Sequence, residues 1–174
     1  MKLAKIIFIT GGQRSGKSSF AMQKALELSK SPIYMATSRI WDNDFKNRVE
    51  RHKTDRNENW TTIEEEKYIS KYDLSEKVVV LDCITLWLTN FFSDCNYDVN
   101  KSLEHAKEEW NKFINNDFTV IVVSNELGMG VHAETEASRK FTDLQGWMNQ
   151  FIAKQAHEVI LMVSGIPVKI ASNL

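Results

Sequence analysis

The chain has 174 residues, of which 43% are hydrophobic and 26% charged, and its formal net charge is -1 at pH 7. This length and composition predict a globular chain with one sizeable core. The near-neutral charge argues against nucleic acid as a partner, because nucleic acids bind broad basic surfaces. No apolar run reaches the roughly 18 residues of a membrane helix, so we expect no membrane span and a cytoplasmic location.

Five apolar runs of strand length follow one another along the chain, and segments with helical spacing separate them. The runs are residues 5–10, 32–37, 77–82, 119–125 and 158–165. Helices are expected at residues 18–29, 42–52, 85–92, 102–115 and 135–156. This alternation predicts an α/β fold with a mostly parallel sheet flanked by helices. The runs are continuously apolar, which indicates burial on both faces, and no linker divides the chain, so we expect a single domain over residues 1–174.

A glycine-rich stretch follows the first run directly. It fits the motif G-x-x-x-x-G-K-[ST] and consists of Gly11, Gly12, Gln13, Arg14, Ser15, Gly16, Lys17 and Ser18. The three glycines let the backbone turn tightly, so that successive N–H groups and the start of the next helix bind phosphates. Lys17 would reach the β- and γ-phosphates of ATP or GTP, and Ser18 would coordinate Mg²⁺. An ordinary glycine turn is the alternative, but the full motif between a strand and a helix favours the P-loop NTPase type.

An acidic residue closes the third apolar run. Asp82 follows four apolar residues, and strand ends of open α/β sheets carry ligand-binding groups. Asp82 is therefore expected on the metal side of the nucleotide, although it could instead cap the helix that follows. Cys83 and Cys95 are the only cysteines, too few for a disulfide framework, and we expect two buried thiols.

A basic segment between the second and third runs reads "DFKNRVERHKTDRNENW". In a helix, His52 would lie at the edge of the apolar stripe formed by Phe45 and Val49, which is a structural role. Alternatively, the surrounding cations attract a polyphosphate and keep the imidazole neutral, so that it can attack phosphorus. The residues alone leave both interpretations open.

A second glycine cluster, "SNELGMGVHAETE", follows the fourth apolar run and predicts a loop at the same edge of the sheet. Glu126 in this loop could face a ligand or solvent. The remaining histidines show no metal-ligand spacing, and we expect His105 and His157 to be structural.

Seven segments in order resemble one family. They are "TGGQRSGKS", "YMATS", "RVERHKTDRNENWTTIEE", "VVVLDCITLWLTN", "VSNELGMGV", "FTDLQGWMNQ" and "VSGIPVKI". Over nearly the whole chain, they resemble the bifunctional adenosylcobinamide kinase and adenosylcobinamide-phosphate guanylyltransferase of cobalamin biosynthesis. A single segment after the glycine loop would be weak, but seven in this order are specific.

The resemblance implies a two-step enzyme that acts on adenosylcobinamide and adenosylcobinamide phosphate, with ATP and GTP as substrates. It implies that His52 carries GMP covalently and is catalytic together with Lys17, and that the enzyme assembles as a homotrimer. Glu64 has a carboxylate that could accept hydrogen bonds from the N1–H and amino groups of guanine. The expected nucleotide contacts outside the glycine loop are Ala36, Thr37, Ser38, Lys53, Thr54, Asp55, Arg56, Glu64 and Asp82.

Some positions depart from the family pattern. Asn57 and Ala133 stand where many relatives have proline, Glu136 stands where they have a basic residue, and Arg51 replaces a second histidine of some relatives. These differences affect the expected loop contacts rather than the nucleotide core. Two other functions keep the glycine loop: a small-molecule kinase without guanylyl transfer, and a nucleotide-dependent switch. The absence of an N-K-x-D sequence weakens the switch hypothesis.

Overall fold

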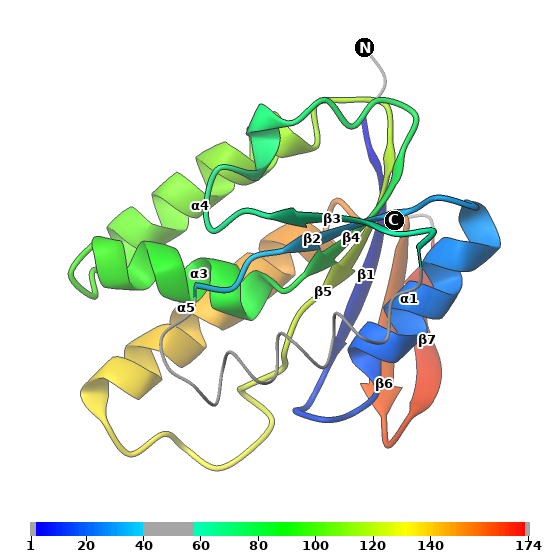
Figure 1. The fold of residues 1–174 in the computed structure, drawn as a ribbon. Helices are drawn as coiled ribbons and strands as arrows, with labels where there is room; N and C mark the ends of the chain where they lie inside the picture. The colour runs from blue at the N-terminus through cyan, green and yellow to red at the C-terminus, as the bar shows by residue number, and fades with distance from the viewer. Residues whose placement is uncertain (1–2, 40–57, 173–174) are drawn as a thin grey trace.

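The computed structural model describes residues 3–39 and 58–172, and a single mixed sheet runs through them (Figure 1). Its strand order is β3-β2-β4-β5-β1-β6-β7. All neighbouring strands pair in parallel except β7, which runs antiparallel to β6. The strands are β1 (Lys5–Gly11), β2 (Ile33–Ala36), β3 (Thr61–Glu64), β4 (Val78–Asp82), β5 (Thr119–Val123), β6 (Glu158–Val163) and β7 (Ile166–Ser172).

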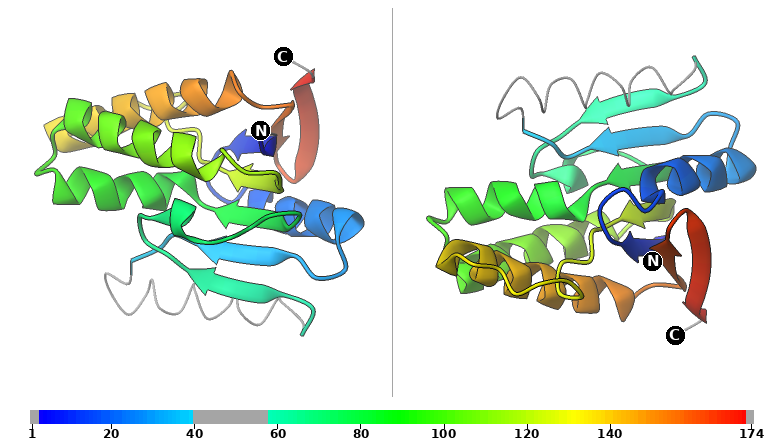
Figure 2. Two further views of the ribbon diagram at one scale, coloured as in Figure 1. Left: turned by 90° about the horizontal axis from the view of Figure 1, so that it is seen from above. Right: turned by 90° about the horizontal axis from the view of Figure 1, so that it is seen from below.

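Helices cover both faces of the sheet, and Figure 2 shows α1 on one side and α3, α4 and α5 on the other. Alternate residues of β1 follow this division: Ile6 and Phe8 pack in the core beneath α3 to α5, whereas Ile7 and Ile9 pack with Ala21 of α1. The strands are thus buried on both faces, as their continuous apolar runs predicted. The helices are α1 (Lys17–Leu28), α3 (Ile84–Asp94), α4 (Val99–Phe113) and α5 (Glu136–Ala153), with a short 3-10 helix η1 (Ile69–Lys71).

The expected α/β architecture is confirmed, and the differences lie at the edges and ends of elements. The sequence did not predict β3, a short polar strand, or β7, which follows a two-residue turn at Ser164 and Gly165 with positive φ at both. Helix α4 begins three residues early because Asp98 accepts a hydrogen bond from the Lys101 N–H at 3.0 Å and forms its N-cap. The expected helix at residues 42–52 lies outside the described residues.

Two smaller expectations can also be compared with the fold. No helix in the described part of the chain has the length and apolarity needed to span a bilayer. Both cysteines are free; Cys83 is buried, but Cys95 is only half-buried, so the expectation of two buried thiols is right for Cys83 alone. Burial raises the pKa of the Cys83 thiol to about 12, which keeps it protonated and unreactive at neutral pH.

Candidate active site

The glycine loop joins the end of β1 to the start of α1, in the strand-loop-helix context that the motif requires. Gly11 and Gly16 have φ values of 148° and 90°, and a Cβ on Gly11 would lie only 2.5 Å from the Met162 carbonyl oxygen. Both positions therefore need glycine. Gly12 differs, because a Cβ there would meet no described atom within 4 Å, so the fold of the loop does not itself demand glycine.

Lys17 lies inside the loop and is only 7% exposed. Its Nζ donates to the Gly12 carbonyl oxygen at 2.6 Å and to Ser15 Oγ at 3.4 Å. Burial lowers the pKa of its ammonium group from the ordinary value, and the negative charge of Asp82 partly offsets this effect. Gly16, the N-cap residue of α1, has no side chain to cap the helix. The first N–H groups of α1 are therefore directed toward the space beside the Lys17 ammonium, where an anion can bind.

Several predicted residues lie on one line along the carboxyl edge of the sheet. The strand pairings place Glu64 beside Ala36, Ala36 beside Asp82, Asp82 beside Val123, and Val123 beside Ile9 just before the glycine loop. With about 4.8 Å between neighbouring strands, Glu64 is about 10 Å from Asp82 and about 19 Å from β1, measured along the sheet. Asp82 thus lies between the glycine loop and Glu64.

Asp82 does not cap the helix that follows it. Cys83 is the N-cap residue of α3, so the capping alternative for Asp82 is wrong. Instead, Asp82 Oδ2 accepts a hydrogen bond from the Tyr34 hydroxyl at 2.7 Å. The Tyr34 ring is 4% exposed and meets the ring of Trp60 edge-on, with 6.2 Å between the ring centroids. A buried phenol therefore orients the half-buried carboxylate, and sequence reasoning did not identify it.

Thr37 is fully buried, and its polar groups are already used within the fold. Its Oγ1 donates to the Cys83 carbonyl oxygen at 2.7 Å and accepts from the Cys83 N–H at 2.9 Å. Its carbonyl oxygen accepts from Asn90 Nδ2 at 2.9 Å, and the same Nδ2 donates to the Glu66 carbonyl oxygen. Thr37 thus connects the ends of β2 and β4, and Asn90 of α3 connects both to the turn after β3.

An ion-pair cluster borders the Glu64 end of this edge. Arg39 donates to Glu66 Oε2 at 2.7 Å and to Asp94 Oδ1 at 3.0 Å, and Lys67 Nζ lies 2.9 Å from Asp94 Oδ2. The hydrogen bonds from Arg39 and Lys67 lower the pKa of Asp94 to about 2. A depression of about 440 Å³ opens here, lined by Arg39, Glu64, Glu65, Glu66, Lys67, Tyr68 and Asp94. Sequence reasoning singled out only Glu64 among these residues.

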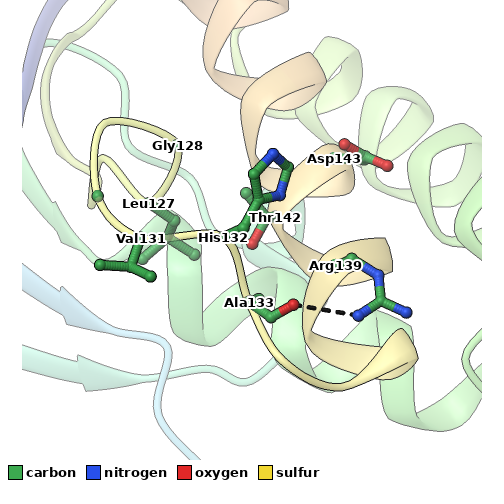
Figure 3. Close-up of a pocket in the computed structure, with 9 residues that line it drawn as sticks. Leu127, Gly128, Val131, His132, Ala133, Arg139, Thr142 and Asp143 are labelled. Carbon is green, nitrogen blue, oxygen red and sulfur yellow. Dashed lines mark hydrogen bonds between the residues drawn. The ribbon is translucent and has the colours of Figure 1, made fainter.

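The second glycine cluster forms the connection from β5 to α5 and contacts the first. The Glu126 N–H donates to the Gly11 carbonyl oxygen at 3.0 Å, and Glu126 Oε1 accepts from the Gly128 N–H at 2.7 Å. Glu126 is therefore partly committed to the loop itself. A pocket of about 190 Å³ lies between this loop and α5 (Figure 3), lined by Leu127, Gly128, Gly130, Val131, His132, Ala133, Arg139, Thr142 and Asp143.

The other predicted residues divide into structural and undescribed ones. His157 Nδ1 accepts from the Ile6 N–H at 3.1 Å, so its structural role is confirmed, and His105 Nδ1 lies 3.6 Å from Cys95 Sγ. Residues 3–39 and 58–172 contain no group of three or more His, Cys, Asp or Glu side chains able to hold a metal ion. His52, Lys53, Thr54, Asp55 and Arg56 lie outside the described residues.

Comparison with known proteins agrees with the family resemblance of the seven sequence segments. The family model described as cobinamide kinase / cobinamide phosphate guanyltransferase matches residues 7–170. The bifunctional adenosylcobalamin biosynthesis protein CobU of Escherichia coli (strain K12) is 35% identical, over 95% of this chain and 99% of the relative. The bifunctional protein CobP of Pseudomonas aeruginosa is also 35% identical, over 91% of this chain and 93% of the relative. A solved structure from Pyrococcus horikoshii OT3 shares the fold alone, with a TM-score of 0.52 and 7% identity over 99% of this chain and 88% of that one.

Proposed function

The chain belongs to the cobinamide kinase / cobinamide phosphate guanyltransferase family, and from this premise we propose how its residues carry out two reactions. The enzyme phosphorylates the hydroxyl of the aminopropanol arm of adenosylcobinamide with ATP or GTP. It then transfers GMP from GTP to that phosphate, releases pyrophosphate and yields adenosylcobinamide-GDP. Because nucleoside triphosphates are its substrates, we propose a cytoplasmic location.

In the kinase step, the loop from Gly11 to Ser18 holds the nucleotide by its phosphates. The substrate hydroxyl attacks the γ-phosphorus, and the bond from that phosphorus to the bridging oxygen of the diphosphate breaks. Lys17 and the N–H groups at the start of α1 stabilise the negative charge on the phosphate oxygens. The observation that supports this assignment is the position of Lys17. Its side chain is buried, and its ammonium group donates to the Gly12 carbonyl oxygen of the glycine loop, close to the start of α1.

Ser18 and Asp82 fit the protein ligands of a Mg²⁺ ion. Mg²⁺ binds hard oxygen donors and uses one or two protein side chains together with waters and substrate phosphates. A hydroxyl and a carboxylate supply such donors; Ser18 follows Lys17 in the first turn of α1, and the negative charge of Asp82 acts on the Lys17 ammonium. When bound, Mg²⁺ would supply positive charge that neutralises the phosphate oxygens of the nucleotide.

In the second step, we assign the nucleophile to His52 from the family resemblance. Its neutral imidazole attacks the α-phosphorus of GTP, pyrophosphate leaves, and a phosphoramidate remains until a phosphate oxygen of the corrinoid displaces the imidazole. Lys53 and Arg56 stabilise phosphate charge. Glu64 is the candidate acceptor for guanine, and its place beside a depression of about 440 Å³ supports that role. For Thr37, whose polar groups have protein partners, we propose positioning of the strand ends.

One experiment tests both steps. Purified protein is incubated with GTP and Mg²⁺ and examined by intact-mass spectrometry for a covalent GMP, and the conversion of adenosylcobinamide to its phosphate is assayed in parallel. We expect His52→Asn to abolish the acid-labile GMP adduct and guanylyl transfer while the kinase step continues, because direct phosphoryl transfer needs no covalent intermediate. His105→Asn, at an exposed position of α4, is the control. An adduct retained by the His52 variant, or equal loss of both activities in a folded variant, would refute the assignment.

We also propose that the enzyme is a homo-oligomer, a homotrimer by family resemblance. The support is a row of apolar side chains on the β6–β7 hairpin, where Val163, Ile166, Val168 and Ile170 are between 47% and 65% exposed. Apolar groups gathered on an edge strand are typical of an interface between subunits.

A further inference from the structure

The connection between β5 and α5 presents unusually exposed apolar side chains. Leu127, Met129 and Val131 are 36%, 79% and 95% exposed, respectively. They lie within five residues of Glu126, whose N–H donates to the Gly11 carbonyl oxygen of the phosphate-binding loop, so the exposed apolar side chains begin beside the active site. Isolated exposed apolar residues are ordinary, but three at alternate positions of one loop form a contact surface.

The loop is tied to the active site at its start and to α5 at its end. The Glu126 N–H donates to the Gly11 carbonyl oxygen at 3.0 Å, and the Ser124 N–H donates to the Ile9 carbonyl oxygen at 2.9 Å. At the other end, Arg139 Nη1 donates to the Ala133 carbonyl oxygen at 3.1 Å and to that of Glu134 at 2.6 Å. A molecule bound on this loop is therefore held at a fixed place relative to the phosphates.

The pocket behind the loop has mixed polarity. Figure 3 shows Leu127 and Val131 on the loop side, Arg139, Thr142 and Asp143 on α5, and His132 between them. Its volume of about 190 Å³ is below the roughly 300 Å³ of pockets that enclose a whole drug-sized ligand. It can take one polar arm of a large molecule while the body of that molecule rests on the apolar loop.

The exposed apolar loop and the pocket of mixed polarity fit the corrinoid that accepts the phosphate better than they fit the nucleotide. A polyphosphate needs cations, but Arg139, the cationic side chain among the pocket's lining residues, donates to the carbonyl oxygens of Ala133 and Glu134, and the acidic Asp143 lines the same pocket. A corrinoid has a broad ring with apolar edges and many amide arms. The apolar loop can pack against the ring, and the polar pocket can hydrogen-bond an amide arm.

We propose that residues 127–133, together with the first turns of α5, bind the corrinoid ring of the acceptor. This inference rests on the proposed kinase function, which supplies a corrinoid with a hydroxyl to be phosphorylated. Binding here directs the aminopropanol arm toward the glycine loop, where the hydroxyl must come within about 3.5 Å of the γ-phosphorus.

The test uses the full chain and two kinds of variant. Met129→Ser with Val131→Ser removes apolar contact at exposed positions, and Thr142→Trp fills the pocket without touching those side chains. Equilibrium dialysis with cobinamide, followed by its visible absorbance, measures corrinoid binding directly, and kinase assays give KM for cobinamide and for GTP. We expect each variant to weaken cobinamide binding about tenfold, because the double serine variant loses the burial of two apolar side chains and Thr142→Trp blocks the pocket. KM for GTP should stay within twofold. Leu28→Ser, at the end of α1 and 49% exposed, is the matched control and should change nothing.

The outcomes separate this inference from the function beneath it. If the wild-type protein does not phosphorylate cobinamide, the proposed function fails. If it does, but both variants bind cobinamide as the wild type does, the corrinoid site is wrong. Equal increases of KM for GTP and cobinamide would assign the loop to the nucleotide, and a changed oligomeric mass of the variants would assign it to a second copy of the chain. Either result would overturn the proposal.

Discussion

At the scale of single residues, Lys17 links the chemistry of the site to the stability of the fold. Burial lowers the pKa of its ammonium, which means that the charged form costs folding free energy at neutral pH when no phosphate neutralises it. We expect Lys17→Met to leave the unfolding midpoint of the nucleotide-free protein unchanged or raised. The same variant should lose about 100-fold or more in kcat/KM for both steps and lose the stabilisation that GTP gives the wild type.

Differential scanning calorimetry with and without GTP measures the unfolding midpoint of the Lys17 variant and its stabilisation by GTP. Lys24→Met on the same helix is the control, because Lys24 pairs with Glu158 at 3.1 Å on the surface and should keep full stabilisation by GTP. Normal GTP stabilisation of the Lys17 variant would contradict the phosphate role.

Tyr34 offers a second test, directed at Asp82. Tyr34→Phe keeps the ring against Trp60 but removes the hydroxyl that donates to Asp82 Oδ2 at 2.7 Å. The carboxylate is then free to rotate, so we expect the Mg²⁺ concentration for half-maximal turnover to rise about three- to tenfold, equivalent to the about 1 kcal/mol of one hydrogen bond. Titration of the kinase rate with Mg²⁺ checks this, and Tyr97→Phe, with a ring that is 57% exposed, should behave as wild type. An unchanged Mg²⁺ requirement would show that the Tyr34 hydroxyl does not orient Asp82 for the metal.

The same residues show what the sequence could reveal of the site. The glycine loop was predictable because its chemistry lies in eight consecutive residues between a strand and a helix. The partners of Asp82 and Arg39 were not, because Tyr34 and Asp82 are 48 residues apart, and Arg39 and Asp94 are 55 residues apart. Only the order of strands in the sheet brings such residues together.

At the scale of elements, the strands that the sequence revealed are those covered by helices on both faces. β1, β4 and β5 are continuous apolar runs because no side of them meets water. β3 has the sequence TTIE and is mostly exposed. Because three of its four residues are polar, it lacks the apolar run by which the other strands were predicted. β7 carries a proline and exposed side chains as the last strand of the sheet, where proline is tolerated.

The cluster of Arg39, Glu66, Lys67 and Asp94 joins the segments that follow β2 and β3 to the end of α3, and it predicts a pH effect. The pKa of Asp94 is lowered to about 2, so its stabilising contribution is complete above the ordinary aspartate pKa and declines as the pH falls toward 2. Asp94 is 35% exposed at its side chain, and screening by solvent reduces the effect. We therefore expect Asp94→Asn to lower the free energy of unfolding by about 1 kcal/mol at pH 7.

Urea denaturation at pH 7 and pH 3 measures the difference between wild type and variant. The difference should shrink by about half at pH 3 and should also shrink in 1 M salt. Glu104→Gln, at an exposed position of α4, is the control. A difference that is constant with pH would rule out the ion pairs as its source.

A buried polar network joins α5 to the end of β5. Asn149 Oδ1 accepts from Ser124 Oγ at 2.6 Å and from Gln145 Nε2 at 2.9 Å, and Asn149 Nδ2 donates to the Asn125 carbonyl oxygen at 3.0 Å. Asn149→Leu leaves these groups unpaired, so we expect a loss of about 2–3 kcal/mol in stability. Because the network fixes the start of the corrinoid-binding loop, KM for cobinamide should also rise more than KM for GTP. Asn111→Leu, exposed on α4, provides the comparison, and an Asn149 variant as stable as the wild type would contradict the network's role.

At the scale of the whole molecule, two parts of the sheet have different surroundings. The glycine loop, Asp82 and Glu64 lie at the carboxyl edge of the sheet, and the β6–β7 hairpin forms the two strands at one end of the strand order. The hairpin also approaches the active site, because the Gly165 N–H donates to the Ser15 carbonyl oxygen at 3.0 Å and a Cβ on Gly16 would lie 3.3 Å from Gly165 Cα. A second copy of the chain that packs on the hairpin would therefore also stabilise the conformation of the glycine loop, because the hairpin turn contacts that loop. If the chain assembles through this hairpin as proposed, we expect assembly and nucleotide binding to be coupled through this contact.

This coupling leads to the last prediction, which concerns self-association. Val168 is 47% exposed on β7, and an edge strand with apolar side chains is covered in a stable protein. We expect the wild type to behave as an oligomer in light scattering and Val168→Lys to fall to the 20.1 kDa of one chain, because each buried lysine would cost several kcal/mol. The variant should stay folded by circular dichroism, since the residue is exposed in the single chain. Its affinity for GTP should fall as the hairpin loses its cover. Leu28→Lys on α1 tests whether any added lysine has this effect, and it should leave the mass unchanged. A wild type that is monomeric at micromolar concentration, or a Val168 variant with the wild-type mass, would show that the hairpin is not the interface and that its apolar row faces water.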